Sequence, residues 1–300
     1  MRFAAAAGLV CALAVCCALA PGVALADDGV FCGAGGAVEL SSSSHVRMVA
    51  EEVVFDCTDP KLAHVSCLFV VVNEGPADTL LIGFPDYWPN TQDDRSVGDG
   101  ASALRDLLIM VDGETIIPEA KPVVSAPAGS WNQAHVWTCT FAPGQTRVLR
   151  TEYRHVYSAT TSASHVVDYI LKTGATWAGP IGLVVLRIKP GELRLKEPGY
   201  PPNWDYTDGE YHWRTTNLEP TQDIFVGMGS PRQYADHLIG YWSHARDSDD
   251  ARREVREFGF LHSSAPEFLD EVLAALPDSL PRLRRFLEDL SAERKAELRR

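Results

Sequence analysis

HVSCLFVVVN, residues 64–73, is an almost unbroken apolar run that ends at a polar residue, Asn73. A strand with one face in water alternates apolar and polar residues, whereas a strand covered on both faces reads as continuous valine, leucine and phenylalanine. This stretch therefore predicts a strand that is buried on both faces at the centre of a β-sandwich.

Another segment, QTRVLRTEYRHVY at residues 145–157, alternates instead. Successive side chains of a strand point to opposite faces of the sheet, so this pattern assigns residues to two faces. One face carries Leu149, Thr151, Tyr153, His155 and Tyr157, and the other carries Val148, Arg150, Glu152, Arg154 and Val156. The pattern predicts a half-exposed strand.

In HVRMVAEEVVFDC, residues 45–57, the apolar positions change parity along the segment. They run through Val46, Met48 and Ala50, and then shift to Val53, Phe55 and Cys57. A β-bulge near Glu51 would absorb this slip of one residue. Glu51 and Glu52 are neighbours, so in a regular strand they face opposite ways and do not form a carboxylate pair.

Comparable short runs, rich in β-branched and aromatic residues and separated by Gly, Pro, Asn and Asp, continue to about residue 228. They predict a mainly β domain over residues 27–230, an antiparallel β-sandwich that can be simple, elaborated or doubled. Beyond Ser230 the period becomes helical. Two apolar stripes stand out, one formed by Phe268, Leu269, Val272, Leu273 and Leu276 and the other by Leu283, Phe286, Leu287 and Leu290. We expect residues 231–300 to form an α-helical C-terminal region of short helices, docked on the sandwich or on a partner.

The first residues have the composition of a secretory signal peptide. Arg2 precedes an apolar run over residues 3–20, and the small-residue triplet Ala24, Leu25, Ala26 follows a Pro-Gly break. We expect cleavage after Ala26, so that residues 1–26 are removed and the mature chain is extracytoplasmic, either periplasmic or secreted. An uncleaved anchor is the alternative. No second run of about twenty apolar residues follows, so no membrane span is expected after cleavage.

Cleavage leaves four cysteines: Cys32, Cys57, Cys67 and Cys139. In an oxidising compartment an even number of cysteines favours disulfides, and four allow three connectivities. Cys57 and Cys67 bracket a turn-like segment, so we predict a disulfide between them and a second between Cys32 and Cys139. The alternative is that some remain free or pair otherwise. No close CxxC pair is present, and no zinc or other metal site is predicted.

The chain has a formal net charge of −13, with 40 acidic and 27 basic residues. Such a surface repels phosphate backbones, so neither nucleic acid nor anionic lipid is an expected partner.

Three aromatic segments are candidates for contact with a ligand or partner. In YILKTGATWAGPIGLVVLRI, residues 169–188, a connection containing Gly174, Trp177 and Gly179 joins two strand-like runs. Trp177 either plugs the end of the sandwich, with its indole N–H bonded to a carbonyl, or is exposed as a stacking platform. GFPD at residues 83–86 supplies Phe84 and Asp86.

A polar loop containing Trp88 follows, and its Asp93, Asp94 and Asp99 lack the spacing of a calcium loop. A solvated acidic loop is the favoured interpretation. The third segment, PGYPPNWDYTDGEYHW at residues 198–213, carries Tyr200, Trp204 and Tyr206. It is the best single candidate for an exposed contact surface, although loops of this kind also cover core edges.

Catalytic motifs are missing from the sequence: it has no G-x-S-x-G elbow, no HExxH and no P-loop pattern. A hydrolase assembled from distant loops stays open, without residues that can be named.

The order of these segments resembles a family of secreted bacterial proteins grouped only as a domain of unknown function. The resemblance rests on the GFPD, TG-x-x-W-x-G and W-x-x-x-N-x-E-P-T-x-D-I patterns. It implies an extracytoplasmic, mainly β protein, and brings no catalytic residues and no cofactor.

From the sequence we expect a secreted or periplasmic, non-catalytic protein that binds, or interacts structurally with, an envelope protein or glycan of the bacterial cell. The first alternative is a carbohydrate-recognition module that uses exposed aromatic side chains. The second is an unrecognised hydrolase.

Overall fold

A computed structural model describes residues 27–33, 36–86, 104–124, 131–157, 165–244 and 265–297. The predicted signal peptide, residues 1–26, lies outside them, as do Trp88 and the acidic loop with Asp93, Asp94 and Asp99.

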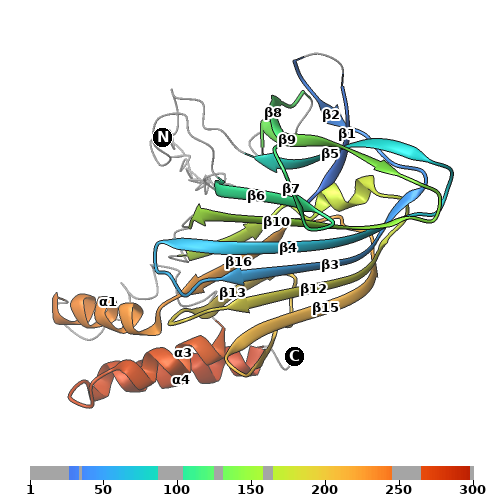
Figure 1. The fold of residues 1–300 in the computed structure, drawn as a ribbon. Helices are drawn as coiled ribbons and strands as arrows, with labels where there is room; N and C mark the ends of the chain where they lie inside the picture. The colour runs from blue at the N-terminus through green and yellow to red at the C-terminus, as the bar shows by residue number, and fades with distance from the viewer. Residues whose placement is uncertain are drawn as a thin grey trace, which may run out of the picture.

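The described strands form three sheets (Figure 1). The largest has the order β14 (Asp205–Thr207), β15 (Glu210–Leu218), β12 (Ile181–Lys189), β3 (Val46–Asp56), β4 (Leu62–Asn73), β10 (Thr146–Val156), β6 (Arg105–Val111) and β7 (Glu114–Ile116). The second has the order β2 (Glu39–Leu40), β1 (Gly29–Cys32), β5 (Asp78–Asp86), β9 (Gln133–Phe141) and β8 (Glu119–Pro122). The third consists of β11 (His165–Tyr169), β16 (Ile224–Gly229) and β13 (Arg194–Tyr200). Neighbouring strands pair antiparallel except β3 and β12, which are parallel.

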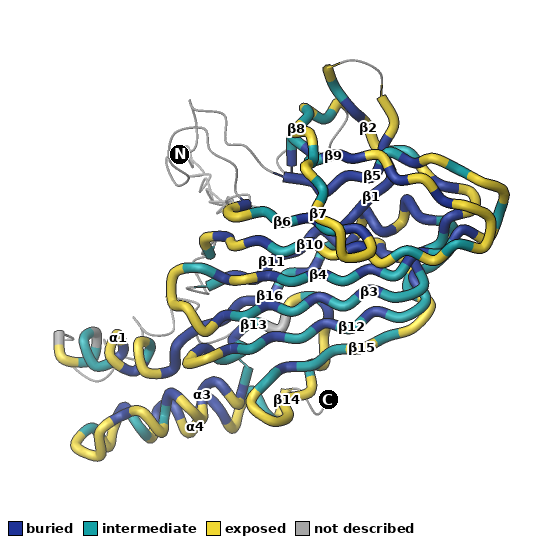
Figure 2. The backbone as a smooth tube through the Cα atoms, in the orientation of Figure 1, coloured by how far each residue is buried: buried dark blue, intermediate teal, exposed yellow. Residues whose placement is uncertain are grey.

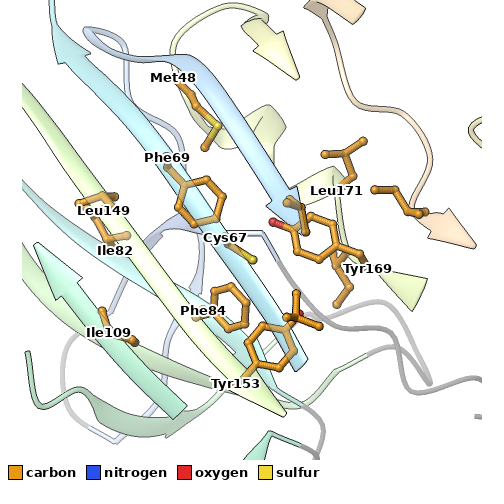
Figure 3. Close-up of a cluster of buried hydrophobic side chains, with 14 of the residues drawn as sticks. Met48, Cys67, Phe69, Ile82, Phe84, Ile109, Leu149, Tyr153, Tyr169 and Leu171 are labelled. Atoms are coloured by element: carbon orange, nitrogen blue, oxygen red, sulfur yellow. The ribbon is translucent and has the colours of Figure 1, made fainter. Parts of the chain in front are cut away.

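The eight-stranded sheet forms one layer of a sandwich, and the two smaller sheets pack against it. Phe55 of β3 meets Tyr169 of β11 with ring centroids 6.1 Å apart, and Phe84 of β5 meets Tyr153 of β10 at 5.4 Å. One hydrophobic core runs between the layers, as the side chains in Figure 3 show. The predicted mainly β, antiparallel fold is confirmed, in its elaborated form, because the second layer is divided into two sheets.

β4 lies in the middle of the large sheet, between β3 and β10, but only one of its faces is fully buried. Val65, Cys67 and Phe69 point into the core with no exposed surface, whereas Leu68 and Val70 on the other face are half-buried. The prediction of burial on both faces was wrong, because the smaller sheets cover only the inner face of the large sheet. The alternating pattern predicted for residues 145–157 is confirmed in β10.

The predicted bulge in β3 is present two residues earlier than expected. Met48 pairs with Val71 of β4 and Ala50 pairs with Val70, so Val49 is the extra residue. From this point the odd-numbered side chains of β3 face the core, and Glu51 is consequently buried.

Three described helices follow β16: α1 (Pro231–His244), α3 (Pro266–Ala275) and α4 (Pro281–Glu297). Both predicted apolar stripes are turned inward, and Figure 2 shows buried and exposed positions alternating along α3 and α4. The stripes of α3 and α4 pack against one another and against α1, and they form a second hydrophobic core beside the one between the sheets. Arg194 of β13 pairs with Glu271 of α3 at 2.9 Å, which joins this cluster to the three-stranded sheet. Among the described residues no helix is both long and apolar enough to cross a bilayer.

Neither predicted disulfide is present, and all four cysteines are free thiols. Cys67 pairs with Val53 in the register of β3 and β4, four residues along the strand from Cys57, which corresponds to roughly 13 Å. β5 runs between Cys32 on β1 and Cys139 on β9. Both separations exceed the reach of a disulfide, whose Cα atoms are at most about 7 Å apart.

Candidate functional site

The connection between β11 and β12 holds the segment that begins at Asp27. It contains the short 3-10 helix η2 (Lys172–Thr176) and Trp177. The Trp177 indole N–H donates to the Asp28 carbonyl oxygen at 2.9 Å, and the Thr173 hydroxyl donates to the Asp27 carbonyl oxygen at 2.8 Å. Trp177 is 3% exposed, so it is a core plug in this structure and does not present a stacking platform.

The two glycines of this connection have different roles. A Cβ added to Gly174 would lie 2.4 Å from Asp27 Oδ2, so the buried Asp27 carboxyl leaves no room for a side chain there. Gly179 has a φ of +66°, a backbone conformation that side chains with a Cβ rarely adopt. Gly174 therefore makes room for Asp27, whereas Gly179 permits the turn into β12. We call residues 172–177, which hold the segment at Asp27, the clamp.

Three buried carboxyl groups lie close together inside this clamp. Asp27 and Asp28 precede β1, and Glu51 extends inward from β3; none is more than 1% exposed. Burial, followed by the neighbouring carboxyl groups, raises the pKa of Asp27 and Asp28 well above the usual range. Burial raises the pKa of Glu51 to about 8, although the Tyr169 hydroxyl donates a hydrogen bond to Glu51 Oε1 at 3.0 Å.

These carboxyl groups meet one expectation of the hydrolase hypothesis, because their pKa values are strongly shifted. They fail another, because a substrate cannot reach side chains with almost no exposed surface. Within the described part of the chain, no three His, Cys, Asp or Glu side chains are arranged to hold a metal ion.

Asp86 and Phe84 of the GFPD segment are also interior residues, each with no exposed surface. Phe84 lies against Tyr153 in the core. Asp86 Oδ2 lies 3.0 Å from His135 Nε2 on β9, and the pair ties the ends of two neighbouring strands together. The structure therefore gives both residues roles within the fold.

The 198–213 segment is only partly exposed. Tyr200 and Trp204 are half-buried and pack on the main core, whereas Tyr206 is 50% exposed. The ring of Tyr206 contacts that of Tyr211 with centroids 4.6 Å apart and the ring planes tilted by 44°. Of the aromatic candidates that the structure describes, Tyr206 is the one best placed to meet a ligand at the surface.

An open cleft of about 500 Å³ lies where β4 and β6 begin and β10 ends, and we call it the Tyr157 cleft. Strand register assembles it, because Val156 pairs with Leu62 and Arg154 pairs with Arg105. The residues that line it are Pro60, Lys61, Leu62, Arg105, Val156, Tyr157 and His165.

Two aromatic rings form the wall of the Tyr157 cleft. The rings of Tyr157 and His165 meet edge to face with centroids 4.7 Å apart. The Tyr157 hydroxyl donates to the Asp59 carbonyl oxygen at 3.0 Å, and His165 Nε2 lies 3.1 Å from the Pro60 carbonyl oxygen. Both side chains thus fix the turn between β3 and β4, which makes the wall rigid.

Among the described residues, the charge of the Tyr157 cleft is opposite to that of the chain. Lys61 and Arg105 are exposed at its rim, none of the described lining residues is acidic, and the whole chain carries −13. Sequence reasoning missed this site, since its members come from the ends of four strands. The only signal was the position of Tyr157 at the end of an alternating strand.

A family model described as Domain of unknown function (DUF4424) matches residues 125–195. The matched range contains the TG-x-x-W-x-G pattern and excludes GFPD and the pattern at residues 213–224. The expected resemblance to a family of unknown function is confirmed over this range.

A crystal structure from Legionella pneumophila, described as a "putative nutrient binding protein", has a similar fold. It has a TM-score of 0.63 and 20% sequence identity, over 90% of this chain and 84% of that chain. An M1 zinc metallopeptidase from Deinococcus radiodurans has 9% identity and a TM-score of 0.31, over 63% of this chain and 43% of that chain. A score this low carries no inference about activity. No curated protein sequence matches.

Proposed function

We propose that this protein is a non-catalytic, extracytoplasmic binding protein of the bacterial cell envelope, and that it takes a small organic anion in the Tyr157 cleft. The observation that carries the proposal is the pair of exposed cations, Lys61 and Arg105, beside an aromatic wall on a strongly acidic chain. The fold shared with the Legionella protein supports a binding role, and the apolar run and small-residue triplet before Asp27 support export.

The cleft suits an anion that also carries an apolar or ring-shaped part. Charge-assisted hydrogen bonds from a guanidinium and an ammonium orient a carboxylate or phosphate group. Tyr157 and Val156 provide apolar surface beside those charges. An open cleft leaves the charges partly hydrated, which predicts modest affinity that weakens as salt rises.

Isothermal titration calorimetry of the exported chain tests this proposal, with benzoate, citrate and inorganic phosphate as probes. We expect saturable binding of at least one probe, and a loss of about tenfold or more in affinity for Arg105→Ala, because a hydrogen bond to a charged group contributes about 1.5–3 kcal/mol. Lys61→Ala should lower the affinity in the same direction.

Arg214→Ala is the matched control, because Arg214 is exposed on β15, away from the cleft, and its removal changes the net charge equally. Equal losses in Arg105→Ala and Arg214→Ala would show non-specific attraction and contradict a site in the cleft. Absence of the chain from the envelope fraction of the producing cells would contradict the proposed location.

One observation favours carbohydrate recognition as a second candidate function. Tyr206 is half-exposed, its ring is supported by the tilted ring of Tyr211, and it offers a flat aromatic surface. Titration with peptidoglycan fragments should then give a fluorescence change that is lost in Tyr206→Ala and kept in Arg105→Ala.

A further inference from the structure

Among the described residues, the buried carboxyl groups of Asp27, Asp28 and Glu51 have no positively charged partner. No lysine, arginine or histidine among the described residues forms an ion pair with any of them. Both carboxyl oxygens of Asp28 and Glu51 Oε2 are buried and make no hydrogen bond within this part of the chain. Buried carboxyl groups are ordinarily paired or hydrogen-bonded, so this arrangement needs an explanation.

The main-chain nitrogen of Asp27 belongs to a residue with no exposed surface. It donates to the Ile170 carbonyl oxygen at 2.7 Å, and the Asp27 side chain fills the space that Gly174 leaves open. Hydrogen bonds from Thr173 and Trp177 fix the carbonyl groups of Asp27 and Asp28. The fold thus holds the first residue after the predicted cleavage position in one place.

We propose that cleavage after Ala26 leaves an α-ammonium group on Asp27 that stays inside the sandwich and pairs with the carboxylates of Asp28 and Glu51. The inference rests on the predicted cleavage and is independent of the Tyr157 cleft. Hydrolysis of the Ala26–Asp27 peptide bond by a signal peptidase places the hydroxyl of water on the Ala26 carbonyl carbon and a hydrogen on the Asp27 nitrogen. The new amine then takes up a proton from solvent and becomes the buried cation.

Removal of the signal peptide therefore completes the fold. Before cleavage, the Asp27 nitrogen is an uncharged amide, and no described residue supplies a counter-charge to the carboxyl groups. After cleavage, a charge-assisted hydrogen-bond network joins β1, β3 and the β11–β12 connection. The titratable groups that face this network are Asp27, Asp28, Glu51, Cys67, Tyr153 and Tyr169.

The stability of the chain without the Asp27 ammonium group and that of the chain with it should depend on pH in opposite directions. Without the ammonium group the raised carboxyl pKa values favour the folded chain at acid pH, and stability falls as pH rises from the unfolded carboxyl pKa toward about 8, the pKa of Glu51. With the ammonium group the carboxylates are ionised, and the pair persists until the amine loses its proton. The two chains should therefore differ most between about pH 6 and 8.

The experiment compares two exported chains that carry a purification tag after Arg300. One starts at Asp27, and the other has Gly-Ser inserted between Ala26 and Asp27, which moves the ammonium group away. We expect the Tm of the Asp27 chain to be higher by on the order of 10 °C at pH 7, since breaking a buried ion pair is strongly destabilising.

Glu51→Gln in both chains separates this pairing from a steric effect of the insertion. We expect Glu51→Gln to lower the Tm of the Asp27 chain and to leave unchanged or raise that of the extended chain. Glu52→Gln is the matched control, because Glu52 is the next residue of β3 and faces outward against Arg187. It should change both chains equally.

Labelling adds an independent readout. The α-amine of folded chain 27–300 should resist an amine-reactive reagent at pH 7 and react on unfolding. Equal effects of Glu51→Gln in both chains, rapid labelling of the folded α-amine, or a mature chain whose mass places its first residue elsewhere would each overturn the proposal.

Discussion

Trp177 and Asp28 are separated by 149 positions in the chain, and the indole N–H of the first donates to the carbonyl oxygen of the second at 2.9 Å. This bond fastens the start of β1 to the connection between β11 and β12. The connection, with Gly174 and Trp177, therefore holds the segment at Asp27 in place.

Replacing Trp177 with phenylalanine should destabilise the protein by about 1–3 kcal/mol, because it leaves the buried Asp28 carbonyl oxygen without its donor. Denaturant unfolding measures the change. Trp204→Phe is the matched control, since Trp204 Nε1 is buried without a hydrogen-bond partner among the described residues. If both variants lose the same stability, the bond to Asp28 contributes nothing beyond ring volume.

Gly174→Ala should cost about 1–3 kcal/mol, because the new methyl group would overlap the Asp27 carboxyl 2.4 Å away and force the clamp open. Gly240→Ala, on α1 with nothing within 4 Å of the added Cβ, should be neutral or slightly stabilising. Thermal unfolding of the two variants measures the difference. An unchanged Tm for Gly174→Ala would show that the clamp accommodates the methyl group without loss of stability.

Local patterns predicted much of the fold. The alternation in residues 145–157 identified the inward face of β10, and the change of parity in residues 45–57 identified the bulge of β3. After the bulge, the odd-numbered residues of β3 face the core, so Glu51 lies on the inward face with Val53 and Phe55. The same alternation, applied to Glu51, would have predicted a buried carboxyl group.

Features that depend on distant pairing were not predictable from one sequence. Cys57 and Cys67 bracket a turn, yet the register of β3 with β4 offsets them by four residues. Nothing in the local sequence predicts that Asp27 and Asp28 are buried, because the residues that hold them lie near residue 173. The Tyr157 cleft likewise arises because four strand ends meet.

The free cysteines should differ sharply in reactivity. Cys32 is exposed, whereas burial raises the pKa of Cys57 to about 12 and that of Cys67 well above its usual range. Because the thiolate is the reactive form, a disulfide reagent at pH 8 should modify one thiol quickly in the folded exported chain and all four on unfolding. Cys32→Ser should abolish the fast phase. Fewer than four thiols in the unfolded, unreduced chain would show that disulfides form after all.

His155 should make stability depend on pH below neutrality. It is 3% exposed, and burial lowers its pKa to about 4, while its Nδ1 lies 3.0 Å from the Val156 carbonyl oxygen. The unfolded chain takes up a proton at this residue near pH 6.5, and the folded chain does so only near pH 4. The contribution of His155 to the free energy of unfolding is therefore fully present above about pH 6.5, and it is lost as the pH drops toward 4.

The whole loss should amount to about 3 kcal/mol. His155→Gln removes the titrating group, so the difference in unfolding free energy between parent and variant should shrink by this amount from pH 7 to pH 4. The difference is the useful quantity, because the buried carboxyl groups titrate equally in both proteins. His237→Gln, on the exposed side of α1, controls for the loss of a histidine. A constant difference between parent and His155→Gln across this range would mean that water reaches His155 and that the ring is not held neutral by burial.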